Sequence, residues 1–357
     1  MSSANTTASE LLEQIHAECS RPWTLMEVCG GQTHALLRHG IDQLLPEAIT
    51  LIHGPGCPVC VTALERIDQA LDLAQDPRVI LCTYGDMLRV PGSDGHDLLS
   101  LRASGADVRI VYAPLDVLKL AQQHSARDVV FFAVGFETTA PATALLAQQA
   151  LAAGLPNLQL LVSHVRVAPV LDQLLSDPAC AVEGVLAAGH VCTVLGDAEL
   201  KTLVQQHRRP VVITGFTAEE LLQGILQCVR QLESGRHQLE NAYASAVRSG
   251  GNPDAQRLLR EVFEPVDTRW RGLGLIQAGG YQLRPPFDRL SIRGAQRTST
   301  NSTATTPDTC PSGLVLQGLL RPSDCPSFGT RCTPDAPMGA PMVSSEGACA
   351  AYYRYHR

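Results

Sequence analysis

The sequence predicts an α/β protein with two related doubly wound domains, in which helices cover both faces of parallel sheets. A short apolar run, a turn and an amphipathic helix recur about seven times between residues 49 and 232, an alternation typical of parallel sheets. The chain has 357 residues, enough for two or three domains. About seven such units suit two doubly wound domains, and a (β/α)8 barrel is the alternative.

Strands are expected wherever a short apolar run ends at turn-forming residues. The expected strands are residues 49–53, 79–83, 108–112, 129–134, 158–162, 185–188 and 211–214. Helical patterns follow these runs, and a clear one spans residues 218–232 with Thr217 as its expected N-cap.

After residue 234 the pattern changes. Residues 236–262 are expected to form a charged helix that ends before Pro265, and a Gly- and Pro-rich region follows over residues 270–286. Residues 297–309 are dominated by Ser and Thr and are expected to be a flexible loop. The tail that begins at Cys310 holds four cysteines among Pro and Gly, so a metal would add to its order.

Composition limits the possible functions. A net charge of −7 and a pI near 5.9 argue against a general nucleic-acid binder. No apolar run is long enough to span a membrane, and the polar first residues do not resemble a secretory signal, so we expect a cytoplasmic protein. There, 12 cysteines indicate metal or redox chemistry more than structural disulfides.

The segment GPGCPVC places Cys57 and Cys60 at a strand-to-helix turn, where parallel sheets bind ligands. The exposed N–H groups and the helix dipole at such a turn favour a thiolate. The spacing allows a disulfide or a shared metal, so redox activity, metal ligation and inert packing all remain open.

The segment MEVCGGQTH contains Cys29, Thr33 and His34 after a short strand-like piece. Cys29 and His34 could act as a nucleophile and a base, or as two metal ligands. The simpler alternative is a buried cysteine followed by a threonine that caps a helix.

In GFETTAP, Glu137 lies in a strand-to-helix loop, where it could cap the helix or face a site at the sheet edge. His164 and His190 also end expected strands and are structural histidines or ligands. Neither a Walker A motif nor a GxGxxG fingerprint occurs, so nucleotide binding has no support from the sequence.

The remaining cysteines fall into two groups. Cys310, Cys325, Cys332 and Cys349 are separated by 15, 7 and 17 positions, and four thiolates can hold zinc or a [4Fe–4S] cluster. The wide spacing favours a cluster, because zinc sites usually contain close pairs. The others, which lie in apolar or helical settings, are expected to be small buried hydrophobic residues: Cys19, Cys82, Cys180, Cys192 and Cys228.

These motifs together resemble the HypD family of [NiFe]-hydrogenase maturation proteins. The resemblance is carried by MEVCGGQTHA, HGPGCPVCV, GFETTAP, GHVCTVLG, VITGFTAEELLQGI and PMVSSEGACAAYYRY. It implies two related α/β domains, expected at residues 1–120 and 121–235, and a C-terminal [4Fe–4S] domain at residues 236–357.

The resemblance also implies an assembly scaffold with redox activity. With a small HypC-type chaperone it would hold iron while cyanide and carbonyl ligands are attached, the cyanide being delivered by a HypE-type partner. Cys29 would then be the iron ligand, and Cys57 and Cys60 a thiol–disulfide couple. His34 and Glu137 would orient ligands or move protons, and the cluster ligands would be Cys310, Cys325, Cys332 and Cys349.

The sequence departs from the family in three places. Gln32 stands where the family often has His, residues 291–308 fit the family poorly, and a frequent Cys-x-Cys at the start of the tail is reduced to Cys310 and Ser312. A free-standing thiol–disulfide oxidoreductase that uses Cys57 and Cys60 is the alternative function, but it leaves Cys29 and the tail unexplained.

Overall fold

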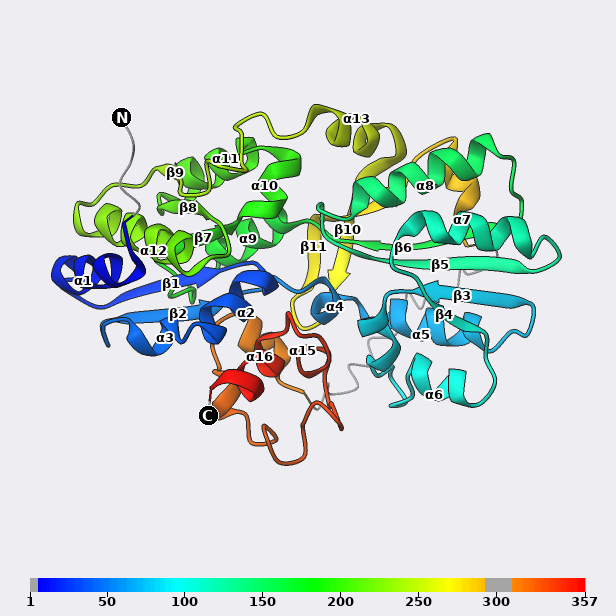
Figure 1. Cartoon of the computed structure of the whole chain (residues 1–357), viewed down its shortest axis with the longest axis horizontal. Coiled ribbons are helices and arrows are strands. Elements are labelled where there is room, and N and C mark those ends of the chain that lie inside the picture. Colours follow the sequence, from blue (N-terminus) through cyan, green and yellow to red (C-terminus); the bar gives the residue numbers. More distant parts are fainter. Residues whose placement is uncertain (1–5, 293–309, 357) are drawn as a thin grey trace.

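The computed structural model describes residues 6–292 and 310–356, which form two α/β lobes lying side by side. The C-terminal segment (residues 310–356) lies below the junction of the lobes in Figure 1. No helix in the described part of the chain is both long and apolar enough to cross a membrane. The poorly fitting stretch 291–308, apart from its first two residues, and the expected loop 297–309 lie outside the described residues.

The first lobe is built on a five-stranded parallel sheet with the strand order β2-β1-β7-β8-β9. Its strands are β1 (Trp23–Glu27), β2 (Ile49–His53), β7 (Gly184–Ala188), β8 (Val211–Thr214) and β9 (Leu239–Asn241). One face is covered by α1 (Ala8–Glu18), α2 (Gly30–Arg38), α3 (Ile41–Leu44) and α12 (Ala218–Glu233). The other is covered by α9 (Val167–Ser176), α10 (Gly189–Leu195) and α11 (Ala198–His207).

The second lobe has a four-stranded parallel sheet with the order β4-β3-β5-β6. Its strands are β3 (Val79–Thr83), β4 (Val108–Ile110), β5 (Asp128–Gly135) and β6 (Leu158–His164). The helices α4 (Pro58–Val61), α5 (Leu64–Ala74) and α6 (Leu98–Ala103), with η1 (Gly85–Arg89), pack on one face. The helices α7 (Pro114–Gln123), α8 (Ala140–Ala152) and α13 (Pro253–Val262), with η2 (Phe287–Leu290), pack on the other. Two open sheets, each covered on both faces, confirm the doubly wound α/β prediction and exclude the barrel.

The sheets divide the chain differently from the expected boundary between residues 120 and 121. Strands of the first sheet come from residues 23–53 and 184–241, whereas all four strands of the second come from residues 79–164. The second lobe is therefore inserted into the first, and the chain crosses between lobes near residues 61–63 and 165–166. Apolar runs of similar composition do not reveal which of them pair, so the sequence pattern alone could not locate these crossings.

In the segment after α12, one expectation is corrected. The predicted helix over residues 236–262 is instead β9, a loop and the shorter α13, which Asn252 caps through the N–H groups of Asp254 and Ala255. The Gly- and Pro-rich region is mostly strand: β10 (Phe263–Trp270) and β11 (Gly274–Leu283) form an antiparallel hairpin.

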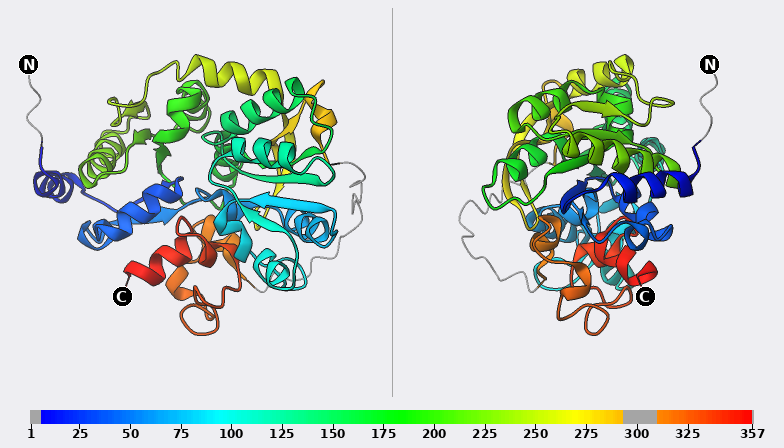
Figure 2. Two further views of the ribbon diagram at one scale, coloured as in Figure 1. Left: turned by 45° about the vertical axis from the view of Figure 1, so that its right-hand side comes forward. Right: turned by 90° about the vertical axis from the view of Figure 1, so that its left-hand side faces the viewer.

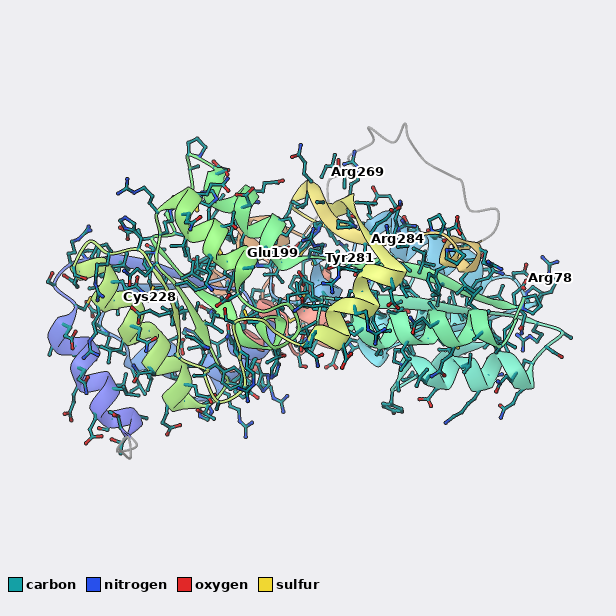
Figure 3. The ribbon with its side chains drawn as sticks, turned by 90° about the horizontal axis from the view of Figure 1, so that it is seen from above. Arg78, Glu199, Cys228, Arg269, Tyr281 and Arg284 are labelled. Atoms are coloured by element: carbon teal, nitrogen blue, oxygen red, sulfur yellow. A yellow bond between two sulfur atoms is a disulfide. The ribbon has the colours of Figure 1, made fainter. Side chains whose placement is uncertain are left out.

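This hairpin lies between the lobes and contacts both places where the chain crosses. At its tip, the N–H of Arg271 donates to the carbonyl of Val61 at 2.9 Å, and Trp270 bridges to Thr62. On β11, the carbonyl of Gly279 accepts from the N–H of Arg166 at 2.9 Å. Figure 3 shows Tyr281 of this hairpin between the two lobes.

The C-terminal segment contains little regular structure and rests on elements of both lobes. It comprises α14 (Ser312–Leu316), η3 (Pro322–Asp324), α15 (Ala340–Val343) and α16 (Ala348–Tyr355). Helix α16 packs on α2, where Ala351 and Tyr352 contact Leu37, and α15 packs against α4. The views in Figure 2 agree on this placement.

Candidate functional site

Cys29 is presented in a turn between β1 and α2, at the carboxyl edge of the first sheet. It is the N-cap residue of α2, with extended backbone angles, and is half-buried. The turn is tight: a Cβ on Gly56 would lie 2.4 Å from the Cys29 nitrogen, so only glycine fits there.

The electrostatic surroundings of Cys29 favour the protonated thiol in the absence of a cation. Burial raises its pKa to about 12; the backbone N–H groups of Gln32 and Gly31 oppose the shift, and the carboxylates of Glu27 and Glu346 add to it. A thiol of this kind is a poor free nucleophile at neutral pH. A bound metal cation would stabilise the thiolate directly, and nothing in these surroundings activates the free thiol as a nucleophile.

His34 and Gln32 do not join Cys29 in one ligand set. The Nε2 atom of His34 lies 3.2 Å from the Tyr355 hydroxyl in α16, so His34 contacts the C-terminal segment. Gln32 is fully buried and its amide nitrogen donates to the hydroxyl and carbonyl of Thr214 at 2.6 and 3.0 Å. Gln32, which stands where the family often has His, is therefore hydrogen-bonded to Thr214 of β8.

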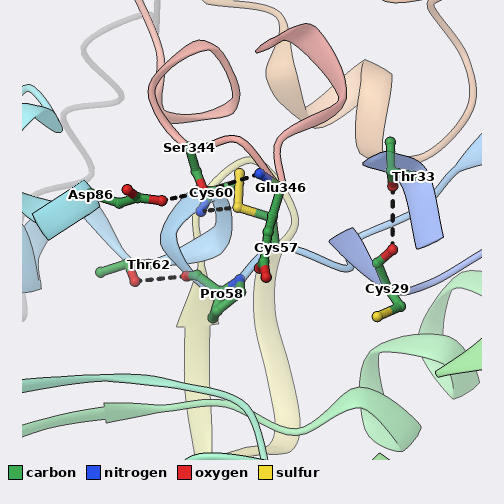
Figure 4. Close-up of a disulfide and its surroundings, with 9 residues drawn as sticks. All are labelled: Cys29, Thr33, Cys57, Pro58, Cys60, Thr62, Asp86, Ser344 and Glu346. Carbon is green, nitrogen blue, oxygen red and sulfur yellow. Dashed lines mark hydrogen bonds between the residues drawn. A yellow bond between two sulfur atoms is a disulfide. The ribbon is translucent and has the colours of Figure 1, made fainter. Parts of the chain in front are cut away.

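Cys57 and Cys60 form a disulfide at the start of α4. The N–H of Cys60 also donates to the Cys57 sulfur at 3.2 Å, and Pro58 occupies the first turn of the helix. Both cysteines are buried, with exposed fractions of 3% and 1%, and they pack into the core of the second lobe. Figure 4 shows this disulfide with the C-terminal segment above it.

The C-terminal segment adds a carboxylate that the sequence reasoning missed. Glu346 lies between the disulfide and Cys29 in Figure 4, and its backbone is so close to Gly30 that a Cβ there would clash at 2.7 Å with the Glu346 carbonyl. Its N–H donates to the Ser344 hydroxyl at 3.3 Å, which in turn donates to Asp86 at 2.7 Å. The signal available was its position three residues before Cys349.

A buried carboxylate–imidazole pair beneath Cys29 was also missed. Glu27 is fully buried and His53 is 4% exposed, and the Nδ1 atom of His53 lies 2.8 Å from a Glu27 oxygen. The other Glu27 oxygen accepts the N–H of Cys29 at 2.8 Å. Glu27 and His53 end adjacent strands next to the two cysteine motifs, which was the available signal.

The four cysteines of the C-terminal segment line one pocket. Its walls are Cys310, Pro311, Ser312, Val315, Cys325, Phe328, Cys332, Gly339, Pro341, Met342 and Cys349. Burial raises the pKa of the Cys349 thiol, and the charges of Cys310, Cys332 and Cys325 add to the shift, which shows that the four sulfurs are near one another. The N–H of Met338 donates to the Cys332 sulfur at 3.4 Å.

A single metal ion would need at least three of these thiols close together. Four sulfurs around one zinc at ~2.3 Å lie about 3.8 Å apart. Among residues 6–292 and 310–356, no three His, Cys, Asp or Glu side chains have an arrangement that could hold one metal ion. The described residues therefore do not form a preassembled site for a single metal ion.

Glu137 lies at the seam between the lobes, where its charge adds to the rise that burial causes in the pKa of Cys192. It is fully buried, and one carboxyl oxygen accepts the N–H of Val167 at 2.9 Å, so it caps α9 of the first lobe instead of the helix that follows it. Burial raises its pKa to about 7. The cap prediction was correct in kind but named the wrong helix.

The other histidines and cysteines have structural surroundings. The Nε2 atom of His164 lies 2.9 Å from the Thr143 hydroxyl, and burial lowers its pKa to about 4. His190 stacks on Phe216 with ring centroids 4.0 Å apart. Of the cysteines expected to be packing residues, Cys82, Cys192 and Cys228 are buried, whereas Cys19 and Cys180 are half-buried.

Two parallel α/β lobes bring a half-buried thiol, a disulfide and a four-thiol pocket together, which defines a thiol-rich α/β protein. Residues 6–356 match the family model HypD, described as the hydrogenase formation hypA family. The chain therefore belongs to the HypD family.

Curated relatives agree along nearly the whole chain. The chain is 45% identical over 338 residues to the hydrogenase maturation factor HypD of Escherichia coli, covering 94% of this chain and 90% of that protein. It is 45% identical over 359 residues to HypD of Azotobacter vinelandii, with 98% and 94% covered. HypD of Rhizobium leguminosarum is 43% identical over 359 residues, with 98% and 93% covered.

Proposed function

We propose that this protein is a hydrogenase maturation factor that acts in the cytoplasm. On it, together with a HypC-type chaperone and a HypE-type cyanide donor, the iron of a [NiFe] site receives its cyanide and carbonyl ligands. One observation carries the proposal: Cys29, the Cys57–Cys60 disulfide and the four-thiol cavity all lie against helices α15 and α16 or the loop between them.

In this proposal Cys29 binds the cargo iron. A thiolate is a soft ligand suited to low-spin iron that carries cyanide and carbonyl. Burial and the neighbouring carboxylates oppose a bare thiolate at Cys29, and both effects are offset once a cation is bound. A Cβ on Gly31 would lie 3.8 Å from the Cys29 sulfur and 3.0 Å from the ring of Phe216, so a side chain at this position would crowd the sulfur.

Cys310, Cys325, Cys332 and Cys349 would hold a [4Fe–4S] cluster. The fit is supported by their common cavity and its apolar walls. A cluster bound there supplies one-electron transfer. The cysteines anchor it, and the walls from Val315, Phe328 and Met342 exclude water from it.

Helix α15 links this cavity to the disulfide. Its Pro341 and Met342 line the cavity, and Ala340 packs in the same core as Cys57 and Cys60. The disulfide takes up two electrons and two protons to become two thiols, and returns them when it re-forms. The pair can therefore store two electrons close to Cys29.

The test is infrared spectroscopy of the full chain co-purified with a HypC-type partner. We expect bands of iron-bound cyanide and carbonyl in the unaltered protein. Cys57→Ser should abolish these bands but keep the visible absorption of the cluster, because it removes the dithiol and leaves the four cluster cysteines unchanged.

Cys180→Ser is the matched control, because Cys180 is a half-buried thiol far from these motifs in the sequence. It should behave like the unaltered protein. Normal bands in Cys57→Ser would contradict the role of the disulfide, and a colourless protein that contains zinc would contradict the cluster.

A free-standing thiol–disulfide oxidoreductase receives less support. Its substrate would need direct access to Cys57 or Cys60, and both are buried under the C-terminal segment. Rapid reduction of a generic protein disulfide by the isolated protein would favour this alternative.

A further inference from the structure

We propose that Glu27 and His53 are positioning residues that hold the Cys29 turn in the conformation in which its sulfur binds iron. The inference rests on the proposed function only in taking iron as the group that Cys29 binds. The hydrogen-bond network that supports it is present in the protein itself.

Glu27 joins the parts of the Cys29 turn through both of its oxygens. One accepts the N–H of Cys29 at 2.8 Å. The other accepts the hydroxyl of Thr33 and lies 2.8 Å from Nδ1 of His53. A single carboxylate therefore fixes the backbone at Cys29, the second turn of α2 and the end of β2 relative to one another.

The network is buried, so the loss of any of its hydrogen bonds is costly in free energy. Glu27 is fully buried and His53 is 4% exposed, and water cannot replace a lost donor cheaply there. The register of β1 and β2 places the two residues side by side at the carboxyl ends of their strands. A carboxylate that accepts from Nδ1 fixes the ring orientation and tautomer of His53.

In this proposal His53 positions the Cys29 turn through Nδ1, the ring nitrogen that faces Glu27. The Nε2 atom is buried and has no hydrogen-bond partner among the described residues. The ring packs edge-on against Tyr352, with centroids 5.4 Å apart. His53 therefore influences the position of Cys29 only through Glu27, by the hydrogen bond that its Nδ1–H donates.

Three substitutions at His53 separate the two nitrogens. His53→Asn places an amide N–H near the position of Nδ1 and removes Nε2. His53→Gln places its amide near Nε2 and leaves Glu27 without that donor. His53→Leu removes both ring nitrogens and keeps much of the volume, and Glu27→Ala removes the acceptor itself.

The first measurement is amide hydrogen exchange on the full-length protein without iron. We expect the Cys29 amide to exchange about 10-fold faster in His53→Leu and His53→Gln, as for the loss of a hydrogen bond to a charged group. In His53→Asn the rate should stay near that of the unaltered protein. Glu27→Ala should show the largest increase if it folds, and the His53 series decides the result if it does not.

The second measurement is anaerobic binding of Fe(II) by the full chain with a HypC-type partner, followed by infrared spectroscopy of the ligand-loaded iron. Affinity should fall about 10- to 100-fold in the Leu and Gln variants, as is usual for loss of a residue that orients a metal ligand. Their cyanide and carbonyl bands should broaden or shift. The Asn variant should restore both.

The outcomes separate the inference from the proposed function. Unchanged exchange and affinity in the Leu and Gln variants would overturn the inference, as would rescue by Gln instead of Asn. If the exchange rates follow the expected order but the unaltered protein binds no iron, the proposed function fails and the positioning role stands.

Discussion

At the scale of single residues, two glycines leave the space that two of the site cysteines occupy. A Cβ on Gly339 would lie 2.4 Å from the Cys310 sulfur, and one on Gly56 would lie 2.4 Å from the Cys29 nitrogen. Real Cβ atoms do not come this close, so each glycine allows a cysteine to sit where it does. Each glycine contacts a different cysteine, so each contact can be tested by its own substitution.

We expect Gly339→Ala to displace Cys310 and to lower the iron and sulfide content of the purified protein. Such overpacking typically costs about 1–3 kcal/mol. Gly250→Ala is the control, because a Cβ at Gly250 would have no atom within 4 Å. An iron and sulfide content equal in both variants would show that Cys310 needs no such clearance.

At the scale of elements, the N-cap of α12 was readable from the sequence. Thr217 accepts the N–H of Glu220 at 3.2 Å, and the Glu220 carboxylate accepts the N–H of Thr217 at 3.1 Å. Helix α12 then runs from Ala218 to Glu233 along one face of the first sheet. The predicted start of this helix is confirmed.

Thr217→Ala should lower the free energy of unfolding by about 1 kcal/mol, because an N-cap side chain is lost. Urea unfolding of the full chain would measure the change. Thr217→Ser keeps the hydroxyl and should restore most of it. Equal losses in both variants would mean that the methyl group of Thr217, and not its hydroxyl, stabilises the helix start.

Buried parallel strands were predictable, and the hairpin was not. All seven expected strands are present, because strands covered on both faces consist of continuous apolar residues. In β10 only Phe263 and Trp270, at its two ends, are buried, so no apolar run marks it. The glycines of β11 likewise resembled a loop in the sequence.

At the scale of the whole molecule, the two lobes meet over a buried acid. Glu137 extends from the second lobe to cap α9 of the first, and burial raises its pKa to about 7 from an ordinary value of 4.5. The folded protein therefore holds this proton more tightly than the unfolded chain does. Stability linked to Glu137 is complete below pH 4.5 and is lost as the pH rises through about 7.

We expect the free energy of unfolding to fall by up to ~3 kcal/mol between pH 4.5 and 8 because of Glu137 alone. Glu137→Gln keeps the oxygen that caps α9 and removes the ionisation, so this part of the pH dependence should vanish. Urea unfolding at several pH values would compare it with Glu219→Gln, a substitution at an exposed glutamate of α12. Identical pH dependence in the two variants would contradict the prediction.

The site itself was predictable in its parts but not in its assembly. The motifs around Cys29, Cys57 and Cys60 stand out locally, because cysteine and glycine at strand ends have few structural reasons to be there. The contributions of Glu346 and His53 depend on how the C-terminal segment docks and on which strands are neighbours. Contacts over such sequence separations leave no periodic pattern in the chain.

The insertion of the second lobe into the first has a consequence for synthesis on the ribosome. Residues 63–165 emerge as one continuous stretch and contain every strand of their sheet, so this sheet can form early, and α13 and η2 cover part of one face later. Strand β1, which leads to Cys29, must wait for β7, whose first residue comes more than 150 positions later. The Cys29 motif therefore reaches its folded arrangement only late in translation, after β7 has been synthesised.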